Sequence, residues 1–149
     1  MNTKKLLIAG AIGAALSVAD AGGAALAHHA FAAEFDGKAP VLLRGKVLRV
    51  EWINPHAWVH INVTGADGKD VEWMVEGGTP NTLLRAGIDR NSLKAGQEII
   101  VRGYQSKDRL CRPACKANGR DVTFPDGKKL FMGSSGTGAP KDGSDPTEK

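Results

Sequence analysis

Two neighbouring segments alternate strictly between apolar and polar residues, and this pattern constrains the fold more than any other feature of the chain. In residues 57–63 and 71–77 the apolar positions lie on one face of a strand and the polar positions on the other. A three-residue loop with Gly68 in the left-handed conformation would join the two strands as a hairpin. A one-residue slip would mix the two faces, so the register is constrained. The expected pairs are Asn62 with Glu72, His60 with Met74, and Trp58 with Glu76.

The segments around this hairpin continue the β pattern and add one short helix. Further strands are expected over residues 41–52 and 97–106, and a terminal hairpin over 120–132 turns at 126–127. A short helix is expected over 81–86. This order is typical of a small, mainly β, OB-like five-stranded barrel with one short helix between strands 3 and 4. Another small barrel or a sandwich would give a similar order, and 149 residues suit one domain.

The two ends of the chain differ in composition from this central part. A positively charged start, an apolar stretch and small residues up to Ala27 predict a signal peptide over 1–27. The apolar stretch is shorter than the roughly 20 residues of a membrane span. We expect an N-terminal arm over 28–40 with two phenylalanines that dock on the body, a β-barrel domain over 41–132, and a disordered tail over 133–149. The protein is therefore expected to be periplasmic or secreted, without an integral membrane segment after signal cleavage.

The four histidines of the chain form two clusters, at positions 28 and 29 and at positions 56 and 60. Cleavage after Ala27 would make His28 the terminal residue, whose α-amine and imidazole can chelate a metal ion together. His56 and His60 share one face of the expected strand, but at about 3.3 Å per residue their Cα atoms would be roughly 13 Å apart. The expected metal site therefore combines a strand histidine with His28 or His29. Nitrogen ligands of this kind suit copper first, or zinc.

The same outer face offers further candidates for ligand binding. Met74 and Glu76 lie beside the strand histidines in the expected register, and a methionine ligand would favour Cu(I). Trp58 lies between His56 and His60. The alternative is that both strand histidines are structural, and that the protein is a metal-free OB-type binding module for a small ligand or a protein partner.

Other functional classes find little support in the sequence. Serines lie in turns or in the tail, and no catalytic residue is assigned, so we expect a binding protein and not an enzyme. A metal-dependent enzyme on the same site is the least favoured hypothesis. The 20 basic and 16 acidic residues are spread along the chain, whereas nucleic-acid binding usually shows a dense basic patch.

The two cysteines, Cys111 and Cys115, are four positions apart in a loop. In an oxidising compartment a local disulfide is the expected state, because it limits the freedom of the unfolded loop. A metal-binding or redox-active pair is the minority hypothesis.

Five segments carry a family resemblance: AHHAFAAEFD, GKVLRVEWINPHAWVHINV, GTPNTLLRAG, SLKAGQEIIVRGY and FPDGKKLF. Their N-terminal AHHSF-type motif and EWxNPHAW motif resemble the DUF6152 family, small exported bacterial proteins of unknown function. The resemblance covers about residues 27–132, with Ala30 in place of the usual serine and the cysteine loop as a local addition. It implies an exported protein and implies no activity.

Overall fold

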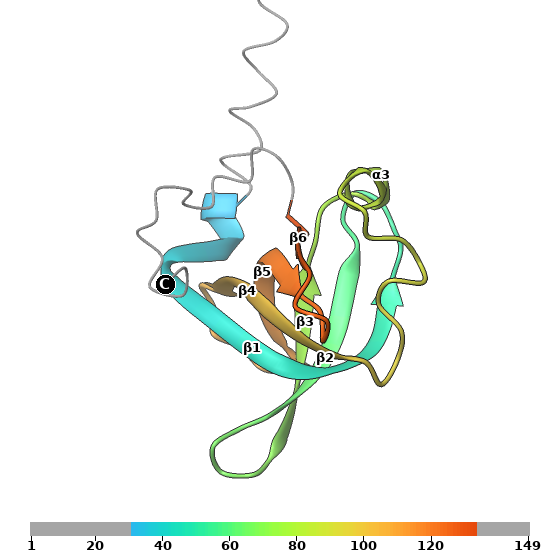
Figure 1. Cartoon of the computed structure of the whole chain (residues 1–149). Helices are drawn as coiled ribbons and strands as arrows, with labels where there is room; N and C mark the ends of the chain where they lie inside the picture. The colour runs from blue at the N-terminus through green and yellow to red at the C-terminus, as the bar shows by residue number, and fades with distance from the viewer. Residues whose placement is uncertain (1–30, 134–149) are drawn as a thin grey trace, which may run out of the picture.

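The structure is a computed structural model, which describes residues 31–133 (Figure 1). The predicted signal peptide, His28, His29 and all but the first residue of the predicted tail lie outside the described residues. The described chain begins with a helical turn over residues 31–34. The elements that follow are β1 (Phe35–Glu51), β2 (Trp58–Thr64), β3 (Asp70–Glu76), α3 (Pro80–Arg85), β4 (Glu98–Ser106), β5 (Cys115–Thr123) and β6 (Lys129–Phe131).

The strands form one sheet whose hydrogen bonding closes on itself. The strand order is β3-β2-β1-β4-β5-β6, and a parallel pairing between β3 and β5 completes a ring of β1, β2, β3, β5 and β4. In Figure 1, α3 lies at one end of the strands and the loop of the β2–β3 hairpin at the other. The mainly β, OB-like class is therefore confirmed, with the short helix between β3 and β4. The short strand β6 is added beside β5.

The central hairpin has the expected register. Trp58 pairs with Glu76, His60 with Met74 and Asn62 with Glu72. Gly68 has a φ of 76°, the left-handed conformation that glycine adopts without steric cost. The N–H of Gly65 donates to the carbonyl of Lys69 at 2.8 Å, which closes the three-residue loop. Local alternation and turn chemistry were therefore sufficient to predict this element.

The structure corrects three element boundaries. The first strand begins at Phe35 and not at residue 41, because its first half pairs with β4 from Phe35 opposite Ser106 onward. The strand that was expected to carry both His56 and His60 begins only at Trp58, so the placement of His56 on a strand is wrong. His56 instead lies in the connection between the end of β1 at Glu51 and the start of β2 at Trp58. The fifth strand begins at Cys115, five residues before the expected terminal hairpin.

The strand β1 bends near its middle and pairs with a different strand on each side of the bend. Residues up to Lys46 pair with β4, and residues from Lys46 onward pair with β2. At the bend, a Cβ on Gly45 would lie 2.2 Å from the carbonyl oxygen of Asn62. Only glycine therefore allows the two backbones to approach this closely.

Two apolar clusters stabilise the fold. The main core lies inside the ring of strands and includes Val47, Val59, Ile61, Val75, Val101 and Ala117, all fully buried. Trp73 packs against this core, as the register predicts. The second cluster joins the start of the described chain to β4: Phe31 and Phe35 are buried against Tyr104, with the Phe31 and Tyr104 rings edge to face. Burial of these aromatic rings fixes the N-terminal arm on the body.

Candidate functional site

His60 lies on β2 between Arg49 of β1 and Met74 of β3, and it is fully buried. Its Nδ1 atom is 2.7 Å from Oε1 of Glu72. Its Nε2 atom is 3.1 Å from Oε1 of Glu51, without the geometry of a hydrogen bond. Each ring nitrogen therefore faces a carboxylate, and a metal ion would have to displace one of them.

Two neighbours, His60 and Arg49, lower the pKa of Glu72. The hydrogen bond with His60 is the main cause that lowers the pKa of Glu72, and the charge of Arg49 adds to the effect. Nη1 of Arg49 lies 3.1 Å from Oε1 of Glu72. The carboxylate is thus ionised at neutral pH and balances the cationic groups around it.

His56 has a different environment, beside a buried carboxylate. Its Nδ1 atom lies 3.2 Å from Oε1 of Glu76, with 35% of the His56 side chain exposed but only 9% of Glu76. Glu76 is the last residue of β3, where it pairs with Trp58 on one side and with Asn118 of β5 on the other. His56 therefore presents a partly open imidazole over a carboxylate that water barely reaches.

Asn118 is the third polar group of this site, and it is buried. Its Nδ2 atom donates to Oε1 of Glu76 at 3.3 Å. Its Oδ1 atom has no hydrogen-bond partner among the described residues. Buried polar atoms are usually satisfied, so this acceptor beside Glu76 is available to a donor or a cation.

Burial also changes the acidity of Glu76. Loss of hydration is the main cause that raises its pKa to about 7, and the negative charge of Glu34 adds to the rise. The Asn118 hydrogen bond and the charge of Lys116 oppose the shift. Near neutral pH this carboxyl group is therefore divided between its protonated and ionised forms, and a bound cation would favour the ionised form.

The N-terminal arm lies next to this group. Phe31 packs on Tyr104, Tyr104 pairs with Asn118, and Asn118 pairs with Glu76. Glu34 of the same arm is 3.7 Å from Nζ of Lys116, measured from its Oε1 atom. The described part of the arm therefore brings the charge of Glu34 close to Glu76.

The structure separates the sequence-predicted site residues into two groups. His56, Glu76 and the half-buried Trp58 lie around one end of β3, whereas Met74 pairs with His60 nearer its middle. Among the described residues, no group of three or more His, Cys, Asp or Glu side chains is arranged to hold a metal ion. Sequence reasoning missed Glu51 and Glu72 as neighbours of His60. It also missed Glu34 and Asn118 as neighbours of Glu76.

The two cysteines form the expected disulfide, Cys111–Cys115, at the start of β5. This bond lies on the same strand as Asn118, three residues before it. The disulfide prediction is confirmed.

The fold and the histidine–carboxylate contacts define a small, mainly β protein of OB-like arrangement with polar groups buried on the outer face of its sheet. The chain belongs to the family of unknown function DUF6152, whose match covers residues 15–112. The match includes both histidine–glutamate pairs and ends before Cys115 and Asn118. No curated protein matches the sequence. In the part of the chain that the structure describes, no helix has the length and apolar character needed to cross a membrane.

Proposed function

We propose that the protein is an exported binding protein that holds a transition metal ion, copper in the first place or zinc, at the His56–Glu76 pair together with the N-terminal histidines. The observation that carries this proposal is the buried carboxylate of Glu76, which lies 3.2 Å from an imidazole nitrogen and beside the open Oδ1 atom of Asn118. The proposal assigns a binding role and no catalytic residue.

The donor types support a late transition metal. Imidazole nitrogen suits Cu(II) and Zn(II), and a carboxylate completes many such sites. An ionised carboxylate buried without a cation is costly, which is why burial raises the pKa of Glu76 to about 7. A divalent ion at this point would remove that cost.

The length of the arm supports the contribution of His28 or His29. His29 precedes Phe31 by two residues, a span of at most about 7 Å between Cα atoms. Phe31 is fixed on Tyr104, whose strand partner Asn118 touches Glu76. The proposal therefore requires that His28 or His29 folds back from Phe31 toward the pair. Export would supply the free amine of His28, if the signal peptide is cleaved after Ala27.

His60 has a structural role in this proposal. Its two ring nitrogens already face Glu72 and Glu51, and the side chain is buried. Met74 pairs with His60 and not with the site at the end of β3. Trp58, which pairs with Glu76, would border the bound ion.

A metal-free binding module is the second candidate, and a groove favours it. A groove of about 790 Å³ lies between the bend of β1, the β2–β3 hairpin and the β5–β6 turn. Its lining combines the cations Arg44 and Lys46 with apolar Ile100 and Phe124. Trp58, which the sequence suggested as a ligand-binding residue, is not part of this groove.

Metal titration of the mature, metal-free protein tests the proposal. We expect His56→Ala, Glu76→Gln and His28→Ala each to weaken Cu(II) binding by at least about tenfold, since each removes one ligand. Glu98→Gln is the matched control, because Glu98 is an exposed carboxylate paired only with Lys46 in the described contacts. Intact mass of the exported protein shows whether the chain begins at His28. Affinity in the micromolar range or weaker that neither His56→Ala nor Glu76→Gln changes would contradict the metal site.

A further inference from the structure

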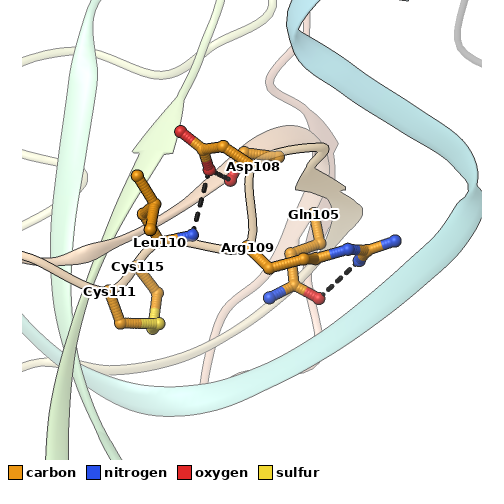
Figure 2. The surroundings of a disulfide bond; sticks show 7 residues. Gln105, Asp108, Arg109, Leu110, Cys111 and Cys115 are labelled. Atoms are coloured by element: carbon orange, nitrogen blue, oxygen red, sulfur yellow. Dashed lines mark hydrogen bonds between the residues drawn. A yellow bond between two sulfur atoms is a disulfide. The ribbon is translucent and has the colours of Figure 1, made fainter.

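The Cys111–Cys115 disulfide closes a very small ring at the surface. It encloses only Arg112, Pro113 and Ala114, in the loop between β4 and β5. Cys111 is exposed, whereas Cys115 is buried as the first residue of β5. Figure 2 shows the two sulfur atoms at one end of the loop, beside the hydrogen-bonded residues that precede them. Cys111 is thus accessible to a reactant in solution, and Cys115 is not.

The loop keeps its shape through contacts that do not involve sulfur. Oγ of Ser106 donates to Oδ1 of Asp108 at 2.8 Å, and the N–H of Leu110 donates to the same atom at 3.0 Å. The N–H of Arg109 donates to the carbonyl of Ser106 at 3.3 Å. The dashed lines in Figure 2 mark the Asp108 contacts together with the Arg109–Gln105 hydrogen bond. These bonds order residues 105–110, the segment that leads into the disulfide ring, without help from sulfur.

The strand that follows is also held without the disulfide. Cys115 pairs with Trp73 at the start of the parallel β3–β5 ladder, and β4 pairs with β5 along the other edge. A cross-link between residues four apart also removes little freedom from the unfolded chain, since the effect grows with loop length. A disulfide that adds little to the strand or to the freedom lost on folding calls for another role.

Basic residues flank the two cysteines in the sequence. Arg112 lies within the ring, and Arg109 and Lys116 lie on either side of it. Arg109 is 2.7 Å from Asp36 and Lys116 is 3.7 Å from Glu34, so two of these cations also bind the arm. Nearby cations stabilise thiolates, which are the reactive species in disulfide exchange.

We propose that Cys111–Cys115 is an exchangeable disulfide that accepts two electrons from the dithiol of a partner protein of thioredoxin-like chemistry. A partner thiolate attacks Sγ of Cys111, the Cys111–Cys115 bond breaks, and Cys115 leaves as a thiolate. The second partner thiolate then attacks the partner sulfur of the mixed disulfide and releases Cys111. The partner ends as a disulfide, the chain ends as two thiols, and the two protons lost by the partner are taken up by Cys111 and Cys115.

The first test compares exchange in the folded and the unfolded chain. The purified protein is equilibrated with dithiothreitol in native buffer and in concentrated guanidinium chloride, and its thiols are counted by alkylation and mass. We expect equilibrium constants for reduction that agree within about tenfold, because the fold does not hold the disulfide closed. A disulfide more than about tenfold harder to reduce in the folded chain is a structural cross-link, and that result overturns the proposal.

The second test identifies the cysteine that forms the mixed disulfide of the proposed step. Cys115→Ser leaves Cys111 alone, and Cys111→Ser leaves Cys115 alone. Each variant is treated with glutathione disulfide, after circular dichroism has shown that it folds. Mixed-disulfide formation is expected to be at least about tenfold faster at Cys111, because it is the exposed member of the pair. Equal rates, or a faster Cys115, overturn the assignment. The metal-binding proposal is independent of both results, since neither cysteine belongs to that site.

Discussion

Nδ1 of His60 lies 2.7 Å from Oε1 of Glu72, a contact that joins β2 to β3 on the outer face of the sheet. The register places His60 opposite Met74, so Glu72 reaches the ring diagonally. Arg49 approaches the same carboxylate oxygen from β1 at 3.1 Å. Glu51 of β1 faces the other ring nitrogen at 3.1 Å, so residues of three strands meet around one buried imidazole.

Removal of this imidazole should destabilise the fold. His60→Ala leaves two carboxylates without their central partner and opens a cavity in a fully buried position. We expect a loss of about 2–4 kcal/mol in the free energy of unfolding, measured by urea denaturation. Lys69→Ala is the control, since 81% of that side chain is exposed and its removal should change stability by less than about 0.5 kcal/mol. Equal effects of the two variants would show that His60 is not structural.

A second polar contact, between Arg102 of β4 and Asp121 of β5, is also buried. Nε and Nη2 of Arg102 lie 2.9 and 2.6 Å from the two carboxylate oxygens of Asp121. Asp121→Ala should lower the free energy of unfolding by about 3–5 kcal/mol, because it removes the carboxylate that accepts two hydrogen bonds from a buried guanidinium charge. Calorimetry measures this loss.

The matched control for that prediction is the double variant Arg102→Met with Asp121→Leu. Apolar residues of similar volume remove both charges, so the double variant should recover most of the stability that Asp121→Ala loses. A double variant as unstable as Asp121→Ala would mean that the position needs the side-chain shape and not the charge balance.

Two backbones approach so closely at Gly103 that any side chain there should destabilise the fold. A Cβ at this position would lie 2.1 Å from the carbonyl oxygen of Asn118, where the β4–β5 register shifts. Gly103→Ala should therefore cost about 3 kcal/mol or more, since the two strands must separate. Gly127→Ala meets no atom within 4 Å and has only the strain of a φ of 83°, on the order of 1 kcal/mol. Similar melting temperatures for the two variants would contradict the steric argument.

The sequence was sufficient for the parts of the fold that depend on near neighbours. The hairpin that carries His60 and Met74 follows from alternation on two strands and from one glycine in the turn. The α3 helix follows from Thr79 and Pro80, and Thr79 does accept a hydrogen bond from the N–H of Thr82. Both elements form from contacts within a few residues, which a single sequence displays directly.

The elements that were missed depend on distant partners. Residues 35–40 have little strand character of their own, but they pair with β4 some 60 residues later. Residues 115–119 are polar or small, and they become a strand because β3 and β4 lie on either side. The same parallel pairing brings Asn118 to Glu76, and the docking of Phe31 brings Glu34 there. Sequence alone could name His56 and Glu76 but not the groups that determine their chemistry.

The acidity of Glu76 leads to a pH dependence of stability for the metal-free protein. Its pKa is raised from 4.5 to about 7 by burial, so the folded state binds a proton that the unfolded state has lost in this range. The stability that this proton supplies is complete below about pH 4.5 and is lost as the pH rises to about 7. The loss is on the order of 2–3 kcal/mol for a carboxyl group this well buried.

Urea denaturation on both sides of that range measures the effect. Glu76→Gln cannot ionise, so its stability should be nearly constant where the wild-type protein becomes less stable, while Glu98→Gln should follow the wild-type profile because Glu98 is exposed. A divalent ion bound at His56 and Glu76 would favour the ionised carboxylate and reverse the wild-type slope. Wild-type stability that stays constant over this range without metal would mean that Glu76 is ionised in the folded protein at low pH as well, and that burial does not raise its pKa.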